Sequence, residues 1–147
     1  MSTIGTRGKT AEALVKKKLA SLESARQAHA RWPDARAGSF AVALADFLIM
    51  RDRRMTLLEV KEVAHDFRMS HTNLGLDQIA RMRMWSSAGA QADVLVYHST
   101  TKLWRTAEIH WFHENYRKVD EKGKAVGSWD LRSLEHVTLD EYFGGWL

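Results

Sequence analysis

Two short stretches of the sequence place charged side chains among apolar residues. Asp46 lies inside the apolar run Phe40–Met50, where an unpaired carboxylate is costly unless it is paired or binds a cation. After twelve intervening residues, Glu59 and Lys61 flank Val60 in a second apolar stretch. Because side chains alternate along a strand, Glu59 and Lys61 are expected on one face and Val60 on the other.

These residues have the chemistry of a metal site. If the chain reverses direction at the charged segment Arg51–Arg54, Asp46 comes to lie opposite Glu59 and Lys61. Oxygen ligands of this kind suit Mg²⁺ or Mn²⁺, and Mg²⁺ commonly uses one or two carboxylates and fills its shell with water and phosphate oxygens. A lysine at such a site can orient an attacking water or stabilise charge on a phosphate. The alternative is a buried ion pair between Asp46 and Lys61, with Glu59 unrelated to it.

The elements that would position these residues follow from hydrophobic periodicity and turn signals. A helix is predicted from Thr10, a plausible N-cap, to about Ala30, ending before Trp32-Pro33. The two apolar stretches, Phe40–Met50 and Thr56–Val63, are predicted to be strands.

The second half of the chain adds a further helix and two more strands. The segment His65–Asn73 is polar and is expected to be a loop, and Leu76–Ser86 is expected to be a helix. Strands are predicted at Asp93–His98 and Leu103–Phe112, followed by a Lys- and Gly-rich stretch and a short amphipathic end at Thr138–Leu147. The order α-β-β-α-β-β predicts an α/β fold with a mixed central sheet flanked by helices.

The Asp46 and Glu59-Val60-Lys61 pattern resembles the core of the PD-(D/E)XK nucleases, which have a restriction-endonuclease-like fold. Glu12 in the first helix occupies the position where many of these enzymes place a further acidic ligand. The segments His71–Leu74 and Gln78–Met82, with the strand pair that follows, are similar to the RecU-like Holliday junction resolvases. The resemblance covers roughly residues 10–113, so the expected single nuclease domain has a flexible tail at 1–9 and a C-terminal extension at 114–147.

The resemblance implies a role for each matching residue. Asp46 and Glu59 would bind Mg²⁺, with Mn²⁺ able to substitute, and the Val60 carbonyl would add a ligand. Lys61 would position or activate the attacking water. Glu12 would complete the metal shell or bind a second ion, and Gln78 would support the site or contact the nearby phosphate.

Composition agrees with an intracellular DNA-binding protein. The 147 residues contain no Cys, which excludes disulfides and thiolate zinc sites, and no apolar run long enough to span a membrane or act as a signal peptide. We therefore expect a cytoplasmic protein in a bacterial cell, and the resemblance alone suggests a phage protein in the host. Residues 1–54 have eleven Lys and Arg against five Asp and Glu, whereas residues 55–147 have eleven against thirteen.

This basic half suggests contacts to a DNA backbone, although solvated helix and turn faces would have the same composition. The residues expected to bind DNA are Lys16, Lys17, Arg36, Arg51, Arg53, Arg54, His71 and Arg81. His71 is proposed as a phosphate contact from a loop, with a satisfied surface residue as the alternative.

Other conspicuous side chains are interpreted as packing. The pair His110 and His113 has no matching Cys or His pair elsewhere, so zinc is disfavoured. Core packing is expected of Met82, Met84 and Trp85 in the second helix. Packing in strands is expected of Trp104 and Trp111, and packing is favoured over a dimer contact or base stacking for Trp129 and Trp146.

The function implied by the resemblance is hydrolysis of DNA phosphodiesters by a dimeric Holliday junction resolvase acting on four-way junctions. A two-fold dimer would match the near two-fold symmetry of a junction. RecU-like enzymes have a projecting segment between the first helix and the Asp strand, for which only residues 30–45 are available here. The alternatives are another nuclease of this superfamily, acting on flaps, ends or duplex DNA, and a non-catalytic DNA-binding module of the same fold.

Overall fold

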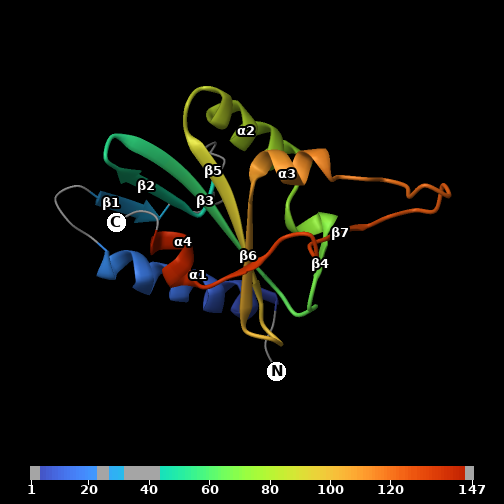
Figure 1. Ribbon diagram of the computed structural model, residues 1–147, viewed down its shortest axis with the longest axis horizontal. Helices are drawn as coiled ribbons and strands as arrows, with labels where there is room; N and C mark the ends of the chain where they lie inside the picture. Colours follow the sequence, from blue (N-terminus) through green and yellow to red (C-terminus); the bar gives the residue numbers. More distant parts are fainter. Residues whose placement is uncertain (1–3, 23–26, 32–43, 145–147) are drawn as a thin grey trace.

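The computed structural model describes residues 4–22, 27–31 and 44–144 and has a twisted sheet at its centre (Figure 1). Within these residues the sheet has the strand order β1-β2-β3-β5-β6-β8. Its strands are β1 (Gln27–Arg31), β2 (Phe47–Arg51), β3 (Arg54–Val63), β5 (Gln91–His98), β6 (Leu103–Glu108) and β8 (His136–Val137). β3 and β5 are parallel, and the other neighbouring pairs are antiparallel. This arrangement confirms the mixed central sheet.

Helices cover the two faces of this sheet. α1 (Ile4–Ser21) and α4 (Leu139–Gly144) lie on one face, and α2 (Leu76–Ser87) and α3 (Ile109–Glu114) lie on the other (Figure 1). Each face has its own apolar core, because alternate residues of each strand point to opposite sides. In β3, for example, Leu58 belongs to the α1 side and Leu57 to the α2 side. No helix in the described residues is long and apolar enough to cross a membrane.

The first predicted helix is too long. α1 ends at Ser21, and Gln27–Arg31, which we expected to be its last turns, form the edge strand β1. This strand pairs antiparallel with β2, with Ala28 opposite Met50. The alternation of Gln27, His29 and the alanines between them fits a strand, and tertiary pairing with β2 outweighs the helix propensity of alanine. The expected flexible tail also changes, since α1 already begins at Ile4.

The predicted hairpin around Arg51–Arg54 is confirmed. Arg51 and Arg54 are cross-strand partners joined by a two-residue turn, in which Asp52 has φ 47° and Arg53 has φ 67°. Two consecutive left-handed residues are typical of the type I′ turn that suits the twist of antiparallel strands. Of the predicted strand Phe40–Met50, residues 40–43 lie outside the described residues, and the observed strand begins at Phe47.

Two further boundaries differ from expectation. The strand predicted to continue to Phe112 ends at Glu108, and the short helix α3 follows. Ile109 and Phe112 are both fully buried and lie three residues apart, which is the spacing of a helix face rather than of a strand. The segment expected to be a loop contains β4 (Arg68–Ser70), which pairs with β7 (Ser128–Asp130), and the 3₁₀ turn His71–Asn73.

Candidate active site

The site lies where β2 ends beside the middle of β3. β2 begins at Phe47, opposite Leu58, so β2 offers no partner to the part of β3 beyond that point. Asp46 takes the place of the missing strand, because its Oδ2 atom accepts a hydrogen bond of 2.8 Å from the Val60 N–H. The N–H and C=O groups of one strand residue point to the same side. The Val60 carbonyl therefore also points toward Asp46.

Glu59 and Lys61 are joined by an ion pair next to this hydrogen bond. The distance from Lys61 Nζ to Glu59 Oε2 is 2.8 Å, and Glu59 is only 5% exposed. The alternative interpretation required an ion pair between Lys61 and Asp46. Lys61 is instead paired with Glu59. Side chains two positions apart in a strand share a face. Leu57 and Val63 face the α2 side of the sheet, so Glu59 and Lys61, which lie between them at the same alternation, face that side too.

The electrostatics of Asp46 show that the site is rich in negative charge. The pKa of Asp46 is raised from 3.8 to about 8, chiefly by burial and then by the Glu59 and Glu12 carboxylates. The Val60 N–H and the Lys61 ammonium act in the opposite direction, lowering the pKa. A bound cation would relieve this repulsion, so the electrostatics fit a positively charged ligand.

The donor atoms also fit a hard divalent cation. Two carboxylates and a backbone carbonyl are ligand types that Mg²⁺ accepts. In the described part of the chain, no three His, Asp or Glu side chains form a ready ligand cluster. Mg²⁺ would accordingly complete its coordination with water and with phosphate oxygens, as it commonly does.

Glu12 belongs to α1, on the opposite side of the sheet from Glu59 and Lys61, and its carboxylate raises the pKa of Asp46. α1 packs on the sheet through Ala11, Val15 and Leu19, which are fully buried and spaced four residues apart. The Ala11 N–H also donates a hydrogen bond of 2.9 Å to Glu62 Oε1. This bond ties α1 to β3 at the residue before Glu12. Strand alternation in β3 places Glu62 on the α1 side, opposite to Glu59 and Lys61. This alternation could have predicted a contact between Glu62 and the first helix.

Two predicted residues lie on α2. Gln78 and Arg81 are half-buried there, and no hydrogen bond or ion pair joins either of them to Asp46, Glu59 or Lys61 within the described residues. The Nε atom of Arg81 is buried without a hydrogen-bond partner. The predicted roles of both residues stay predictions.

The basic residues expected to bind DNA fall into separate groups. Lys16 and Lys17 are exposed on α1, and Arg53 and Arg54 are exposed at the β2–β3 hairpin. Arg51 is half-buried. Arg36 lies outside the described residues.

His71 is part of an aromatic cluster. Its ring centroid lies 4.3 Å from that of Tyr116 and 4.5 Å from that of Trp129, and burial lowers its pKa. A phosphate contact by His71 stays a prediction.

Several of the packing expectations can be checked directly. Trp104 and Trp129 are buried, and Trp129 Nε1 donates to the Phe112 carbonyl at 2.9 Å. Met82 is buried, but Met84 is 70% and Trp85 42% exposed, so their assignment to the core was wrong. α2 contacts the core through the face that carries Ile79 and Met82, and the other two side chains point away from that face.

Trp111 and His110 both belong to the short helix α3. Trp111 lies in α3 rather than in a strand, and Trp146 lies outside the described residues. His110 accepts a hydrogen bond from Arg83 Nε at 3.3 Å and lies 3.1 Å from Ser86 Oγ, so it links α3 to α2.

A buried polar network at the C-terminal end of β5 was not predicted from the sequence. His98 is fully buried, and its Nδ1–H donates to the His65 carbonyl at 2.7 Å. Its Nε2 atom is therefore unprotonated and accepts from Arg105 Nη1 at 3.1 Å. Arg105 also donates to the carbonyls of Asp66 and Leu134. The sequence signal for this network was the presence of His98 and Arg105 in otherwise apolar strands.

This network predicts a loss of stability in acid. Burial lowers the pKa of His98 below its ordinary value of 6.5, and the Arg105 guanidinium and His136 act in the same direction. The unfolded chain therefore takes up this proton first, so His98 contributes stability above pH 6.5 that is lost as the pH falls through the lowered pKa. The free energy of unfolding should decline by at most about 1.4 kcal/mol per pH unit from this one proton. Urea titrations between about pH 5 and 8 should give a shallower decline for His98→Gln; an equally steep one would contradict the assignment.

Comparison with known proteins identifies the fold. No family model and no curated protein sequence matches the chain. A similar solved structure is that of Archaeoglobus fulgidus Hjc, a Holliday junction resolvase from an archaeal hyperthermophile. The TM-score is 0.57 at 16% sequence identity, and the match covers 93% of this chain and 95% of that chain. The mixed α/β fold of this chain is thus shared with a Holliday junction resolvase.

Proposed function

We propose that this chain is a metal-dependent, structure-selective DNA endonuclease of the PD-(D/E)XK type, acting as a Holliday junction resolvase. The observation that carries the proposal is the meeting of Asp46 with Val60, Glu59 and Lys61 beside the point where β2 ends. The sequence pattern Asp-x₁₂-Glu-x-Lys and the fold shared with the archaeal Hjc structure support the same proposal independently of that geometry.

The residues have separate parts in the proposed mechanism. Asp46, Glu59 and the Val60 carbonyl would hold Mg²⁺ or Mn²⁺, and Glu12 would complete the shell or serve a second ion. When bound, the ion supplies stabilisation of the charge on the phosphate and lowers the pKa of water. Lys61, held by Glu59 at 2.8 Å, is placed to orient the attacking water and to stabilise the phosphate oxygens. The Val60 N–H fixes the orientation of the Asp46 carboxylate.

The proposed substrate is branched DNA, and the proposed assembly is a homodimer. A two-fold dimer presents two equivalent sites to the opposing strands of a four-way junction, which allows paired nicks. The exposed cations of α1 and of the β2–β3 hairpin are candidates for contacts to the DNA backbone. Contacts of Lys and Arg to phosphates position a protein on DNA without reading its sequence.

A cleavage panel tests this proposal. The wild-type protein should nick a four-way junction symmetrically in Mg²⁺ or Mn²⁺ and should be inactive in EDTA, because the carboxylate site needs the ion. Flap, linear duplex and single-stranded DNA of the same sequence should be cut poorly. Preferential cutting of another substrate would identify a different nuclease of this type, and binding without cutting of any substrate would indicate a non-catalytic DNA-binding module.

A further inference from the structure

A narrow arm projects from the body of the molecule between α3 and β7 (Figure 1). We define the arm as residues 117–126. Its two sides are joined by a bridge between Val119 and Ala125 and by a hydrogen bond of 2.9 Å from the Val126 N–H to the Lys118 carbonyl. The Asp120 N–H donates to the Lys124 carbonyl at 2.8 Å. The arm is therefore a small hairpin with a defined backbone.

The core does not require this hairpin. Every residue from 117 to 125 is exposed, including Val119 at 52%, and only Val126 is half-buried. An isolated two-stranded hairpin is marginal in water, so its own hydrogen bonds and its attachment must hold it. At its base, Tyr116 contacts His71 and the buried ring of Trp129, with ring centroids 4.3 and 5.9 Å away. The base of the arm is thus anchored to the body, while the side chains of residues 117–125 are exposed.

The arm has four cationic side chains and two acidic ones. Lys118, Lys122 and Lys124 form no ion pair within the described residues. Arg117 donates only to the carbonyls of Glu114 and Tyr116.

One of the two acidic residues in the arm has a structural role. Asp120 Oδ1 accepts hydrogen bonds from the backbone N–H groups of Lys122 and Lys124, at 2.8 and 2.9 Å. Gly123, with φ 79°, completes the turn between them. Asp120 therefore shapes the tip so that the lysines extend into solvent.

The arm leaves the body on the side of the sheet that carries Glu59 and Lys61. α3 and Trp129, which flank the arm in sequence, belong to the same core cluster as the β3 residues Leu57 and Val63. The arm is therefore on the same side of the sheet as the side chains proposed to cut DNA.

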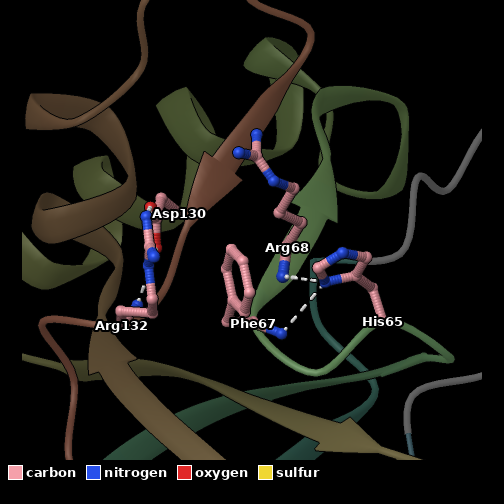
Figure 2. Close-up of polar contacts among 5 residues, drawn as sticks. All are labelled: His65, Phe67, Arg68, Asp130 and Arg132. Carbon is pink, nitrogen blue, oxygen red and sulfur yellow. Dashed lines mark hydrogen bonds and ion pairs between the residues drawn. The ribbon is translucent and has the colours of Figure 1, made fainter.

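An arginine pair lies beside the strands that carry the base of the arm. The guanidinium carbons of Arg68 and Arg132 lie 5.5 and 4.3 Å from the centre of the Phe67 ring, and Arg132 is also paired with Asp130 (Figure 2). Phe67 follows β3 in the chain, and β4, which contains Arg68, pairs with β7. The exposed cations Arg68 and Arg132 therefore lie beside the β4–β7 strand pair, from which the arm extends.

We propose that the arm is a DNA-binding element that grips the phosphate backbone of one duplex arm of the branched substrate through Lys118, Lys122 and Lys124. This inference rests on the proposed function. DNA has one negative charge per about 1.7 Å of its axis, so exposed lysines without ion pairs gain by displacing counterions there. The major groove, about 12 Å wide, also admits a two-stranded ribbon. A hairpin that projects from the body with exposed side chains is suited to contact a partner beyond the body.

The test compares two variants with the same change in net charge. Lys122→Gln/Lys124→Gln removes two positive charges from the arm, and Lys102→Glu makes an equal change at the exposed β5–β6 turn. Binding of a synthetic four-way junction is measured by fluorescence anisotropy across a range of KCl, in the Asp46→Asn background so that DNA is not cut. The arm variant should bind about ten-fold more weakly, and the slope of log K against log salt should shrink by up to about 0.9 per lost contact. Lys102→Glu should change neither value appreciably.

A third variant distinguishes binding that depends on the conformation of the arm from binding that depends only on its net charge. Asp120→Ala removes an anion, which would strengthen binding if only net charge mattered. A shaped arm predicts weaker binding with little change in the salt slope, because the tip loses two hydrogen bonds while its cations remain. Unchanged junction affinity and salt slope in the double-lysine variant, or tighter binding by Asp120→Ala, would overturn the arm proposal. Wild-type binding without Mg²⁺-dependent cleavage would instead overturn the proposed nuclease activity and leave the salt slopes to decide on the arm.

Discussion

Replacing Asp46 by Asn should abolish junction cleavage while making the metal-free protein more stable. The amide oxygen of Asn can still accept the Val60 N–H, but it carries no charge to hold a divalent cation. Cleavage in Mg²⁺ should fall by at least about 100-fold, which corresponds to about 2.7 kcal/mol of transition-state stabilisation. Junction binding should persist, since the proposed backbone contacts lie elsewhere. Single-turnover cleavage and gel-shift assays give the two readouts.

The stability gain has a definite pH dependence. The pKa of Asp46 is raised from 3.8 to about 8, so the folded wild-type protein retains a proton that the unfolded chain has released between these values. Its stability from this group therefore falls as the pH rises through that window, and the penalty is complete above about pH 8. Asn lacks the penalty. In EDTA, Asp46→Asn should be the more stable protein, by on the order of 2 kcal/mol at pH 9 and by little at pH 4.

Glu59→Gln serves as the matched variant for this prediction. It too should stop cleavage, but it breaks the ion pair with Lys61 and leaves that ammonium without its partner at 2.8 Å. The two variants should therefore differ in stability while agreeing in activity. Full cleavage by either variant in Mg²⁺ would contradict the assignment of the site, and lower stability of Asp46→Asn at pH 9 would contradict the electrostatics described for it.

Replacing Arg105 by Met should destabilise the whole fold. Arg105 is 7% exposed, and its guanidinium donates to the Asp66 carbonyl, the Leu134 carbonyl and His98 Nε2, at 2.6, 3.3 and 3.1 Å. Met fills similar space but donates nothing, so three acceptors lose a partner at once. We expect the free energy of unfolding to fall by about 2–4 kcal/mol in urea titrations at pH 7.5.

Arg83→Met is the control for this loss. Arg83 is half-buried, and its Nε donates one hydrogen bond to His110 at 3.3 Å, so its replacement should cost about 1 kcal/mol or less. If both variants lost the same stability, the network around Arg105 would have no special role. Because Arg105 and His98 share a hydrogen bond, Arg105→Met should also flatten the acid decline expected from His98.

The sequence predicted the parts of this site that depend on local patterns. Alternation in β3 separates Glu59 and Lys61 from Val60, and the charged hairpin brings Asp46 back beside them. Both features arise within a few residues of each other, so periodicity and turn chemistry suffice to find them.

Features that depend on distant pairing were not accessible in the same way. Gln27–Arg31 has enough alanine for a helix and becomes a strand because β2 offers it an edge. The short helix α3 was hidden because a run of apolar and aromatic residues suits a buried strand equally well. The hydrogen bond from the Ala11 N–H to Glu62 Oε1 joins residues 51 positions apart, and no local pattern predicts this particular partner. Tertiary contacts decided each of these cases.

The arrangement of α1 and α4 on one face also sets an order of assembly. The core on that face combines Val15 of α1 with Phe143 of α4, and an ion pair joins Lys18 to Asp140. These elements come from opposite ends of the described chain, with all the strands of the sheet between them. Contacts of such long sequence separation carry a loop-closure cost and slow folding. We therefore expect the face that presents Glu12 to acquire its full packing late, after the hairpin that brings Asp46 to Glu59 has formed.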